Sequence, residues 1–250
     1  MLTVRMLDEL AEFDTALIAN TIGYLNPTPA HEYYMGGSIR SLIPQLGPTV
    51  GVAVTCEMDS STPGGDAAFE GFWAQLDDIK TLGLPSVWVV KTVGSRPDHE
   101  CVLGDGMAKL LHAGGCVGVV TDGGVRDVRG METIPFAAYG KGTTIHHCAI
   151  RIRSTGKPVE VGGITIQPGD VIHANAEGVI RVPSACVEAL PLALARMRAA
   201  EHEAHLFFRR TDLSSGEKQA LADEVFEKYG FASTGSEEFR TAPERGSEVD

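Results

Sequence analysis

GDGMAKLLHAGGCVGVVTDGGVRDV, residues 104–128, is the stretch of sequence that decides the fold. Within it, Asp105–His112 follows a glycine-rich turn and carries apolar residues at helical spacing, which predicts a helix ended by a glycine pair. The next segment, Cys116–Thr121, is an apolar run that predicts a strand. A polar turn then leads to adjacent Arg126 and Asp127.

A second apolar strand is expected upstream, at Ser86–Thr92, because the run SVWVVKT is typical of a strand covered on both faces. Strand, helix and strand at this spacing predict a parallel βαβ crossover. Thr49–Met58 predicts another strand, and Ala67–Leu82 has a helical pattern that Gly83 ends. The expected fold class is therefore α/β, with this βαβ unit at its centre.

The N-terminal segment predicts a helix followed by an irregular loop. Residues 6–19 place apolar side chains at mostly helical spacing, and this helix is expected to end near Gly23. Pro27 and Pro29 exclude a regular helix from the loop Tyr24–Gly37, which could cover a site or face a neighbouring subunit.

The second half of the chain predicts short strands separated by turns. Thr143–Arg153 alternates in a strand-like way, and Gly162 and Gly163 mark the turn of a hairpin. Two further apolar runs, residues 171–173 and 179–182, follow other turns. This half is therefore expected to be rich in β-structure.

The C-terminal region predicts two helices and a polar tail. Val187–Phe208 is rich in alanine, leucine and charged residues, and Ser214–Tyr229 begins with the spacing of a capping box. The acidic tail from Ser233 is expected to be loosely ordered unless a partner holds it. We expect one domain over residues 1–210 and a helical arm with this tail over residues 211–250.

Composition limits the class of protein. The 250 residues are 43% hydrophobic and carry a net charge of −12, so a sizeable core is expected and nucleic-acid binding, which needs basic clusters, is disfavoured. Five widely spaced cysteines without a CxxC pair favour reduced thiols in a cytoplasmic protein. A signal-peptide h-region is missing from the N-terminus, and no apolar run approaches the roughly 18 residues of a membrane span. Neither a membrane nor a nucleic acid is expected as partner.

The turn Gly104–Met107 is a candidate anion site. The first N–H groups of a helix lack intrahelical partners and carry partial positive charge, and glycines let a carboxylate or phosphate approach the backbone. The simpler alternative is a glycine turn that only joins a loop to a helix. The turn has neither the GK[ST] ending of a P-loop nor the GxGxxG pattern, so a nucleotide site is poorly supported.

Arg126 and Asp127 should emerge at the C-terminal end of a strand, where α/β folds usually place ligands. An arginine can grip a carboxylate at two points, and an aspartate is a hard oxygen ligand suited to Mg²⁺ or Mn²⁺. The alternatives are a surface salt bridge and a helix cap. Asp122 is interpreted as a turn residue rather than a ligand.

Taken together, residues 104–107, the helix that follows and residues 118–127 (GVVTDGGVRD) resemble the 4-hydroxy-4-methyl-2-oxoglutarate aldolase family, also called RraA-like. The 22-residue step from the first glycine to the arginine (126 minus 104) matches the family pattern. Two later segments, residues 168–171 (PGDV) and 177–183 (EGVIRVP), are similar too, and the likeness covers roughly residues 10–205.

The resemblance implies a fold, an assembly and an activity. The fold is the swivelling β/β/α type, assembled as homotrimers or homohexamers with sites between subunits. The activity is that of a metal-dependent class II pyruvate aldolase, or of an oxaloacetate decarboxylase-type lyase, acting on short 2-keto di- or tricarboxylic acids and releasing pyruvate. Mg²⁺ or Mn²⁺, together with Arg126, would stabilise the pyruvate enolate that both reactions form.

The resemblance also implies roles for individual residues. The backbone of Gly104, Asp105, Gly106 and Met107, together with the Arg126 side chain, would hold the pyruvoyl carboxylate and keto oxygen. Arg126 and Asp105 would be the catalytic residues, Asp105 by orienting a metal-bound water.

Other implied roles concern the metal and the proton donor. Asp127 would bind the metal, and Glu201 or Glu203 would donate a proton to the site of a neighbouring subunit, unless each is only a solvated helix charge. Asn175 stands where family members often carry an aspartate, which weakens any role that needs charge there. Lys109 is interpreted as a surface residue.

Three histidines have alternative interpretations. His146 and His147 are expected on opposite faces of a strand, so they cannot easily chelate one metal. His173 precedes a turn and could either line the site or serve a structural role.

The leading hypothesis is thus a cytoplasmic, Mg²⁺- or Mn²⁺-dependent carbon–carbon lyase that forms a homo-oligomer. The alternative is a non-catalytic RraA-like regulator acting by protein–protein contact. A methyltransferase is disfavoured, because no glycine-rich cofactor loop follows the first strand.

Overall fold

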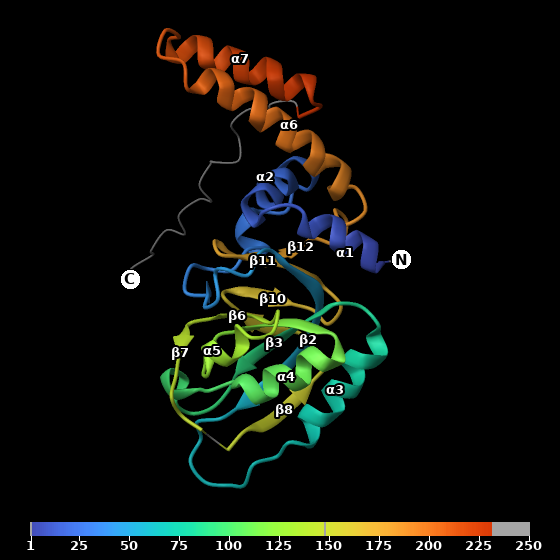
Figure 1. Cartoon of the computed structure of the whole chain (residues 1–250), viewed down its shortest axis with the longest axis vertical. Coiled ribbons are helices and arrows are strands. Elements are labelled where there is room, and N and C mark those ends of the chain that lie inside the picture. Colours follow the sequence, from blue (N-terminus) through green and yellow to red (C-terminus); the bar gives the residue numbers. More distant parts are fainter. Residues whose placement is uncertain (1, 148, 232–250) are drawn as a thin grey trace, which may run out of the picture. The chain divides into compact units, whose positions relative to one another are not determined.

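A computed structural model describes residues 2–147 and 149–231 of the chain (Figure 1). The chain divides into two compact units, Met1–Leu194 and Ala195–Asp250. The tail from Ser233, predicted to be loosely ordered, lies outside the described residues.

The first unit is organised around an eight-stranded mixed sheet with the strand order β1-β6-β4-β3-β2-β11-β12, and β8 pairs with β2 beside this path. The strands of this sheet are β1 (Arg40–Ser41), β2 (Thr49–Asp59), β3 (Ser86–Thr92), β4 (Cys116–Thr121), β6 (Ala137–Gly140), β8 (Arg151–Thr155), β11 (Val171–Asn175) and β12 (Gly178–Val182). β3, α4 (Asp105–Gly114) and β4 form the predicted parallel crossover, in which Val87 lies opposite Gly118. The α/β class and its central βαβ unit are confirmed.

β2 is the strand that joins the parts of this sheet. One of its edges pairs in parallel with β3. Along its other edge, residues 49–52 pair with β11 and residues 56–59 pair with β8, both antiparallel. β8 and β11 therefore attach to the βαβ half through β2, and β12 pairs with β11, whereas β6 pairs with β4.

Helices α3 (Glu70–Leu82), α4 and α5 (Val128–Met131) cover one face of the sheet (Figure 1). Trp88 of β3 lies in the core beneath them, where its ring packs edge-on against Phe72 with centroids 5.7 Å apart. Its indole N–H donates to Gln75 Oε1 at 2.9 Å, so this buried polar group is satisfied.

The opposite face of the sheet is covered by a second core. β9 (Val159–Val161) and β10 (Ile164–Ile166) form the predicted hairpin, joined by Gly162 and Gly163 at φ values of 62° and 85°. Glycine adopts these left-handed conformations without the steric cost of a Cβ. The inward side chains of the hairpin pack with apolar residues of β2, β3, β4, β6 and β11.

The single helix predicted over residues 6–19 is wrong, because the chain forms two helices there, α1 (Val4–Ala11) and α2 (Thr15–Leu25). Asp14 is the cause of the break. Its side chain accepts the N–H of Leu17 at 2.8 Å and thereby caps a new helix.

The continuous strand predicted over Thr143–Arg153 is also wrong. β7 (Gly142–Thr143) pairs in parallel only with the short strand β5 (Gly124–Val125), and β8 begins further along the chain. Thr144 N still donates to Val125 O at 2.9 Å. The partner segment then turns away into α5, so the ladder cannot continue.

Short 3₁₀ turns complete the connections of the first unit. They are η1 (Ala30–Glu32), in the proline-rich loop after α2, and η2 (Pro97–His99), in the loop between β3 and α4. The first agrees with the prediction that prolines exclude a regular helix from that loop.

The second unit contains most of α6 (Leu190–Phe208) and all of α7 (Ser215–Lys228). α7 begins with the predicted capping box. Ser214 Oγ accepts the N–H of Glu217 at 3.3 Å, and the Glu217 carboxylate accepts the N–H of Ser214 at 2.8 Å. A domain boundary between residues 210 and 211 stays a prediction.

Cys56, Cys101, Cys116 and Cys186 are buried, and none of these four forms a disulfide. This agrees with the predicted reduced thiols. Within the described ranges, no helix is both long and apolar enough to cross a membrane.

Candidate active site

The candidate site is assembled where the segment before α4 runs parallel to the segment after β4. Gly124 N donates to Glu100 O at 3.0 Å, and Arg126 N donates to Leu103 O at 3.0 Å. These backbone bonds bring the N-terminus of α4 beside Arg126 and Asp127, although a whole helix and strand separate them in the sequence.

Gly104 lies in direct contact with the Arg–Asp pair. A Cβ built on Gly104 would lie 2.6 Å from Asp127 Oδ2 and 3.0 Å from Arg126 Nε, so no larger residue fits without displacing these groups. Gly104 is also the N-cap residue of α4 and supplies no side-chain cap, while Met107 anchors the first turn against the core. The start of α4 therefore presents its partial positive charge next to a guanidinium.

Asp127 adopts a strained backbone conformation. Its φ of 58° and ψ of 34° are left-handed, and it is the one non-glycine residue with positive φ among residues 2–147 and 149–231. Such conformations cost about 1–3 kcal/mol and cluster at functional sites. Arg126 Nε lies 3.1 Å from Asp127 Oδ2, and the two side chains are 29% and 43% exposed, so a ligand can reach both.

Asp105, the first residue of α4, pairs with Lys109 one turn along the helix. Lys109 Nζ lies 2.6 Å from Asp105 Oδ2, and this bond is the main cause that lowers the pKa of the Asp105 carboxyl below its ordinary value. Gly130 of α5 leaves room for this side chain, because a Cβ there would approach the Asp105 Cβ to 2.6 Å. Lys109 is half exposed, as its interpretation as a surface residue implied. Its ion pair with the candidate site residue Asp105 was not predicted.

Asp122 is a structural link at the start of the turn. Its Oδ1 accepts the N–H and the hydroxyl of Thr92 at 2.8 and 2.9 Å, and its Oδ2 accepts Lys91 Nζ at 2.6 Å. Both oxygens of the carboxylate thus bond to the end of β3, which agrees with the interpretation of Asp122 as a turn residue rather than a ligand.

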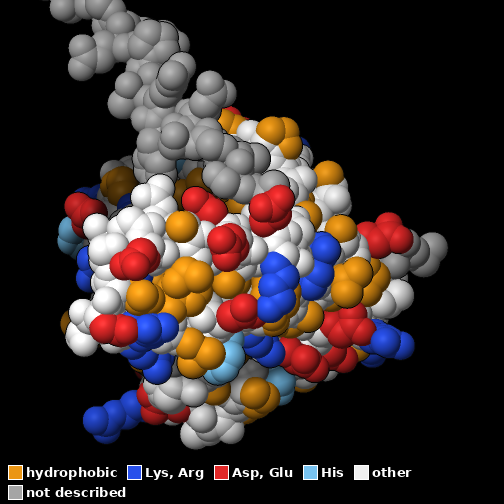
Figure 2. Space-filling view, turned by 90° about the horizontal axis from the view of Figure 1, so that it is seen from above, with side chains coloured by type: hydrophobic (Ala, Val, Ile, Leu, Met, Phe, Trp, Pro, Cys, Tyr) orange, Lys and Arg blue, Asp and Glu red, His pale blue; other side chains and the backbone are white. Residues whose placement is uncertain are grey.

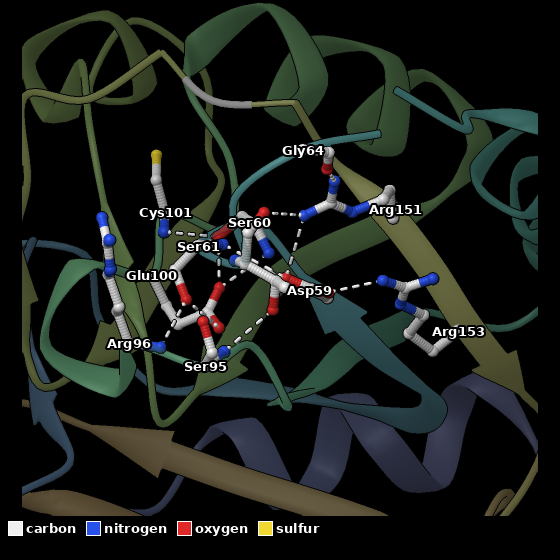
Figure 3. Close-up of polar contacts among 11 residues, drawn as sticks. Asp59, Ser60, Ser61, Gly64, Ser95, Arg96, Glu100, Cys101, Arg151 and Arg153 are labelled. Atoms are coloured by element: carbon white, nitrogen blue, oxygen red, sulfur yellow. Dashed lines mark hydrogen bonds and ion pairs between the residues drawn. The ribbon is translucent and has the colours of Figure 1, made fainter. Parts of the chain in front are cut away.

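Sequence reasoning missed a polar cluster at the C-terminal end of β2 (Figure 3). Asp59 is buried there, and although burial raises the pKa of its carboxyl, hydrogen bonds led by the one from Arg153 hold that pKa below its usual range. Glu100 is buried in the same cluster and accepts hydrogen bonds from two serines of the loop after β2. The sequence signal is weak, because polar residues after an apolar strand also mark an ordinary turn.

The histidines lie apart from this chemistry. His146 and His147 are exposed and lie between β7 and β8 rather than on a strand. His173 is fully buried, with Nδ1 3.0 Å from Thr15 Oγ1 and Nε2 3.3 Å from Leu10 O, and burial lowers its pKa to about 4. Of its two predicted roles, the structural one is therefore confirmed.

Glu201 and Glu203 lie on α6 in the second unit, whereas the other candidate residues lie in the first. Glu203 accepts hydrogen bonds from Lys228 Nζ at 2.7 Å and Tyr229 Oη at 3.0 Å, and the Lys228 bond is the main cause that lowers the pKa of its carboxyl. Asn175 Oδ1 accepts a turn N–H at 2.8 Å. A proton-donor role for either glutamate in a neighbouring subunit stays a prediction.

The donors available to a metal are few. Within the part of the chain that the structure describes, no group of three or more His, Cys, Asp and Glu side chains could hold a metal ion. Mg²⁺ usually keeps several waters and binds through one or two carboxylates together with its substrate. The exposed carboxylate of Asp127 fits such a water-rich coordination shell.

Charges of both signs are mixed on the molecular surface that Figure 2 shows, where Lys and Arg side chains are interspersed with Asp and Glu side chains.

Fold and site together define a class of protein, a mixed α/β protein in which the start of a helix lies against an Arg–Asp pair. The RraA-like family model, described as Aldolase/RraA, matches residues 11–181. The chain therefore belongs to the RraA-like family.

Relatives of known sequence or structure support this assignment. A curated protein of Halalkalibacterium halodurans, named "Putative 4-hydroxy-4-methyl-2-oxoglutarate aldolase", is 37% identical over 100 residues, which are 40% of this chain and 46% of the relative. The matched region thus spans about half of that relative's length.

Solved structures show the same fold. An uncharacterized protein from Pseudomonas syringae pv. tomato has a TM-score of 0.67 and 22% identity, with 88% of this chain and 95% of that chain covered. Streptomyces coelicolor RraAS2, described as an unusual member of the RNase ES inhibitor RraA protein family, has a TM-score of 0.62 and 22% identity, with 84% and 98% covered.

Proposed function

We propose that this protein is a divalent-metal-dependent carbon–carbon lyase that acts on short 2-keto di- or tricarboxylic acids and releases pyruvate, by aldol cleavage or by decarboxylation. The observation that carries the proposal is the contact of Gly104 with both Arg126 and Asp127 at the start of α4. This contact supports the proposal because it brings a helix start suited to a carboxylate, a guanidinium and a carboxylate suited to a divalent cation into one small region.

In this proposal the groups at the site divide the work of binding, charge stabilisation and proton exchange. The N–H groups at the start of α4 and the guanidinium of Arg126 bind the carboxylate and keto oxygen of the substrate. The same guanidinium stabilises the negative charge that develops on the keto oxygen when the carbon–carbon bond breaks. Asp105, kept ionised by Lys109, orients the water that exchanges a proton with the substrate.

Asp127 is the residue that would hold Mg²⁺ or Mn²⁺. A divalent cation there would add positive charge opposite the developing enolate oxygen. The left-handed backbone of Asp127 directs its carboxylate to the same side as Gly104 and Arg126, and this common side supports the assignment.

We extend the proposal to a homotrimer or homohexamer in which α6 of a neighbouring subunit supplies the proton donor. Glu203 is bonded to Lys228 and Tyr229, and its lowered pKa favours the ionised carboxylate, which carries no proton to donate. Glu201 and Glu203 both stay candidates for this role. The oligomeric state is measured by light scattering of the full chain.

The test of function is pyruvate release, coupled to lactate dehydrogenase, from oxaloacetate and from 4-hydroxy-4-methyl-2-oxoglutarate with added Mn²⁺. We expect turnover with at least one substrate and its loss on treatment with a chelator. Arg126→Ala should raise KM or lower kcat by about 10- to 100-fold, because a charge-assisted contact is lost. Asp127→Asn should lose the metal-dependent turnover.

Arg129→Ala is the matched control for these variants, because Arg129 is an exposed arginine on the adjacent helix α5. It should keep wild-type kinetics. Full activity of Arg126→Ala or Asp127→Asn would remove that residue from the mechanism. Silence with both substrates, together with stoichiometric capture of a protein partner, would favour the alternative of a non-catalytic regulator.

A further inference from the structure

Glu100 occupies an unusual position between two loops at the C-terminal end of the sheet. It lies in the loop between β3 and α4, is only 2% exposed, and faces the loop that follows β2 (Figure 3). A buried carboxylate is costly unless donors surround it. Gly94 leaves the space it needs, because a Cβ at Gly94 would overlap Glu100 Oε1.

Two serines supply the donors. Ser60 N donates to Glu100 Oε2 at 2.8 Å, Ser60 Oγ donates to the same oxygen, and Ser61 Oγ donates to Oε1 at 2.9 Å. Ser60 Oγ also accepts the N–H of Cys101 at 2.8 Å. The hydroxyl of Ser60 thus ties both the side chain of Glu100 and the next backbone amide to the end of β2.

The backbone of Glu100 faces the candidate active site. Its carbonyl accepts Gly124 N at 3.0 Å, and Val102 N donates back to Gly124 O at 2.9 Å. These two bonds begin the parallel pairing that ends with Arg126 N donating to Leu103 O, next to Gly104. The side chain of Glu100 therefore fixes one of the two segments whose alignment forms the site.

We propose that Glu100 is a positioning residue, which holds Gly104 in register with Arg126 and Asp127 through Ser60. The inference rests on the proposed function for its kinetic consequence, while the register itself can be measured without any activity. The Glu100 side chain accepts its hydrogen bonds from Ser60 and Ser61, whereas its backbone carbonyl accepts Gly124 N, so its proposed effect on the site passes through the backbone.

Asp59 is a matched control within the same cluster. It is a buried carboxylate in the same loop region, but it binds Arg151 and Arg153 and the backbone of its own loop. A change at Asp59 should destabilise the cluster without shifting the segment that carries Gly104.

The first experiment is hydrogen exchange, measured by mass spectrometry on peptides that cover residues 100–107 and 122–130. Glu100→Gln and Ser60→Ala should each speed exchange of the Val102 and Arg126 amides by about tenfold relative to Asp59→Asn. Glu100→Gln replaces an accepting carboxylate oxygen with an NH2 group, and Ser60→Ala removes a donor from the buried carboxylate. Equal exchange in the Glu100 and Asp59 variants would overturn the proposal, whether or not the wild-type protein shows lyase activity.

The second experiment is kinetic. If the wild-type protein releases pyruvate, Glu100→Gln should lower kcat/KM by about 100-fold, because a shift of about 1 Å in the site has such an effect. Asp59→Asn should stay within about twofold once the folded fraction is matched. The double variant of Glu100→Gln with Ser60→Ala should lose no more than the worse single variant, since both act through one link.

Two results would contradict the link between Glu100 and Ser60. One is a double variant whose loss of kcat/KM equals the sum of the two single losses in free energy, and the other is a Glu100→Gln variant with the same kinetics as Asp59→Asn. A wild-type protein without lyase activity would refute the proposed function. In that case the exchange data alone decide whether Glu100 sets the register.

Discussion

Close contacts between small and charged residues define the candidate site at the scale of single residues. Gly104 and Gly130 each leave room for one carboxylate, at Asp127 and Asp105 respectively. Adding a methyl group at either glycine would displace a charged group of the site while leaving the distant core unchanged.

Gly104→Ala tests this arrangement directly. The new Cβ should displace the Asp127 carboxylate and the Arg126 side chain, and kcat/KM for pyruvate release should fall by about 10- to 100-fold. The free energy of unfolding, measured in urea, should change by no more than about 1 kcal/mol. Gly216→Ala, in the first turn of α7 with no atoms within 4 Å of the new Cβ, should keep full activity. Equal activity in both variants would contradict the contact.

His173 should make the protein sensitive to acid. Its folded-state pKa of about 4 lies below the ordinary value of 6.5, so the unfolded chain takes up the proton first as the pH falls. Stability is therefore fully present above pH 6.5 and falls toward pH 4, by on the order of 3 kcal/mol. In urea unfolding between pH 7.5 and 4.5, His173→Asn should flatten this decline. Replacing the exposed His202 by Asn should not, and an unchanged slope in His173→Asn would refute the assignment.

Caps set the boundaries at the scale of helices and strands. Sequence patterns identified the central βαβ unit because buried apolar runs are long and carry their own signal. They missed the break between α1 and α2, because the apolar spacing is helical on both sides of Asp14 while the Asp14 side chain caps a new helix. They extended a strand beyond β7 because alternation in the sequence does not reveal where a partner strand turns away.

Asp14→Ala measures the strength of that break. Loss of the hydrogen bond from Leu17 N should lower the free energy of unfolding by about 1 kcal/mol, as for other N-caps. Asp8→Ala, at an exposed position within α1, should change it by less than about 0.5 kcal/mol. Comparable losses in the two variants would mean that Asp14 does not act as a cap.

For the whole molecule, sequence predicts the site in part. The Gly104 turn and the Arg126–Asp127 pair are visible because they lie in one continuous stretch with a spacing that matches a family pattern. The link from Glu100 to Ser60 is invisible, because it joins loops that meet only after the parallel sheet has formed. The same holds for the pairing of Asp122 with Lys91 and Thr92, which the strand register creates.

β2 has a consequence for how the first unit loses its structure. One of its edges pairs with β3 of the βαβ half, and the other edge pairs with two strands from the second half of the chain, β11 on residues 49–52 and β8 on residues 56–59. β8 and β11 cannot separate from the βαβ half unless β2 loses the backbone hydrogen bonds along one of its edges. We therefore expect the first unit to melt cooperatively, with the candidate active site lost in the same transition as the sheet.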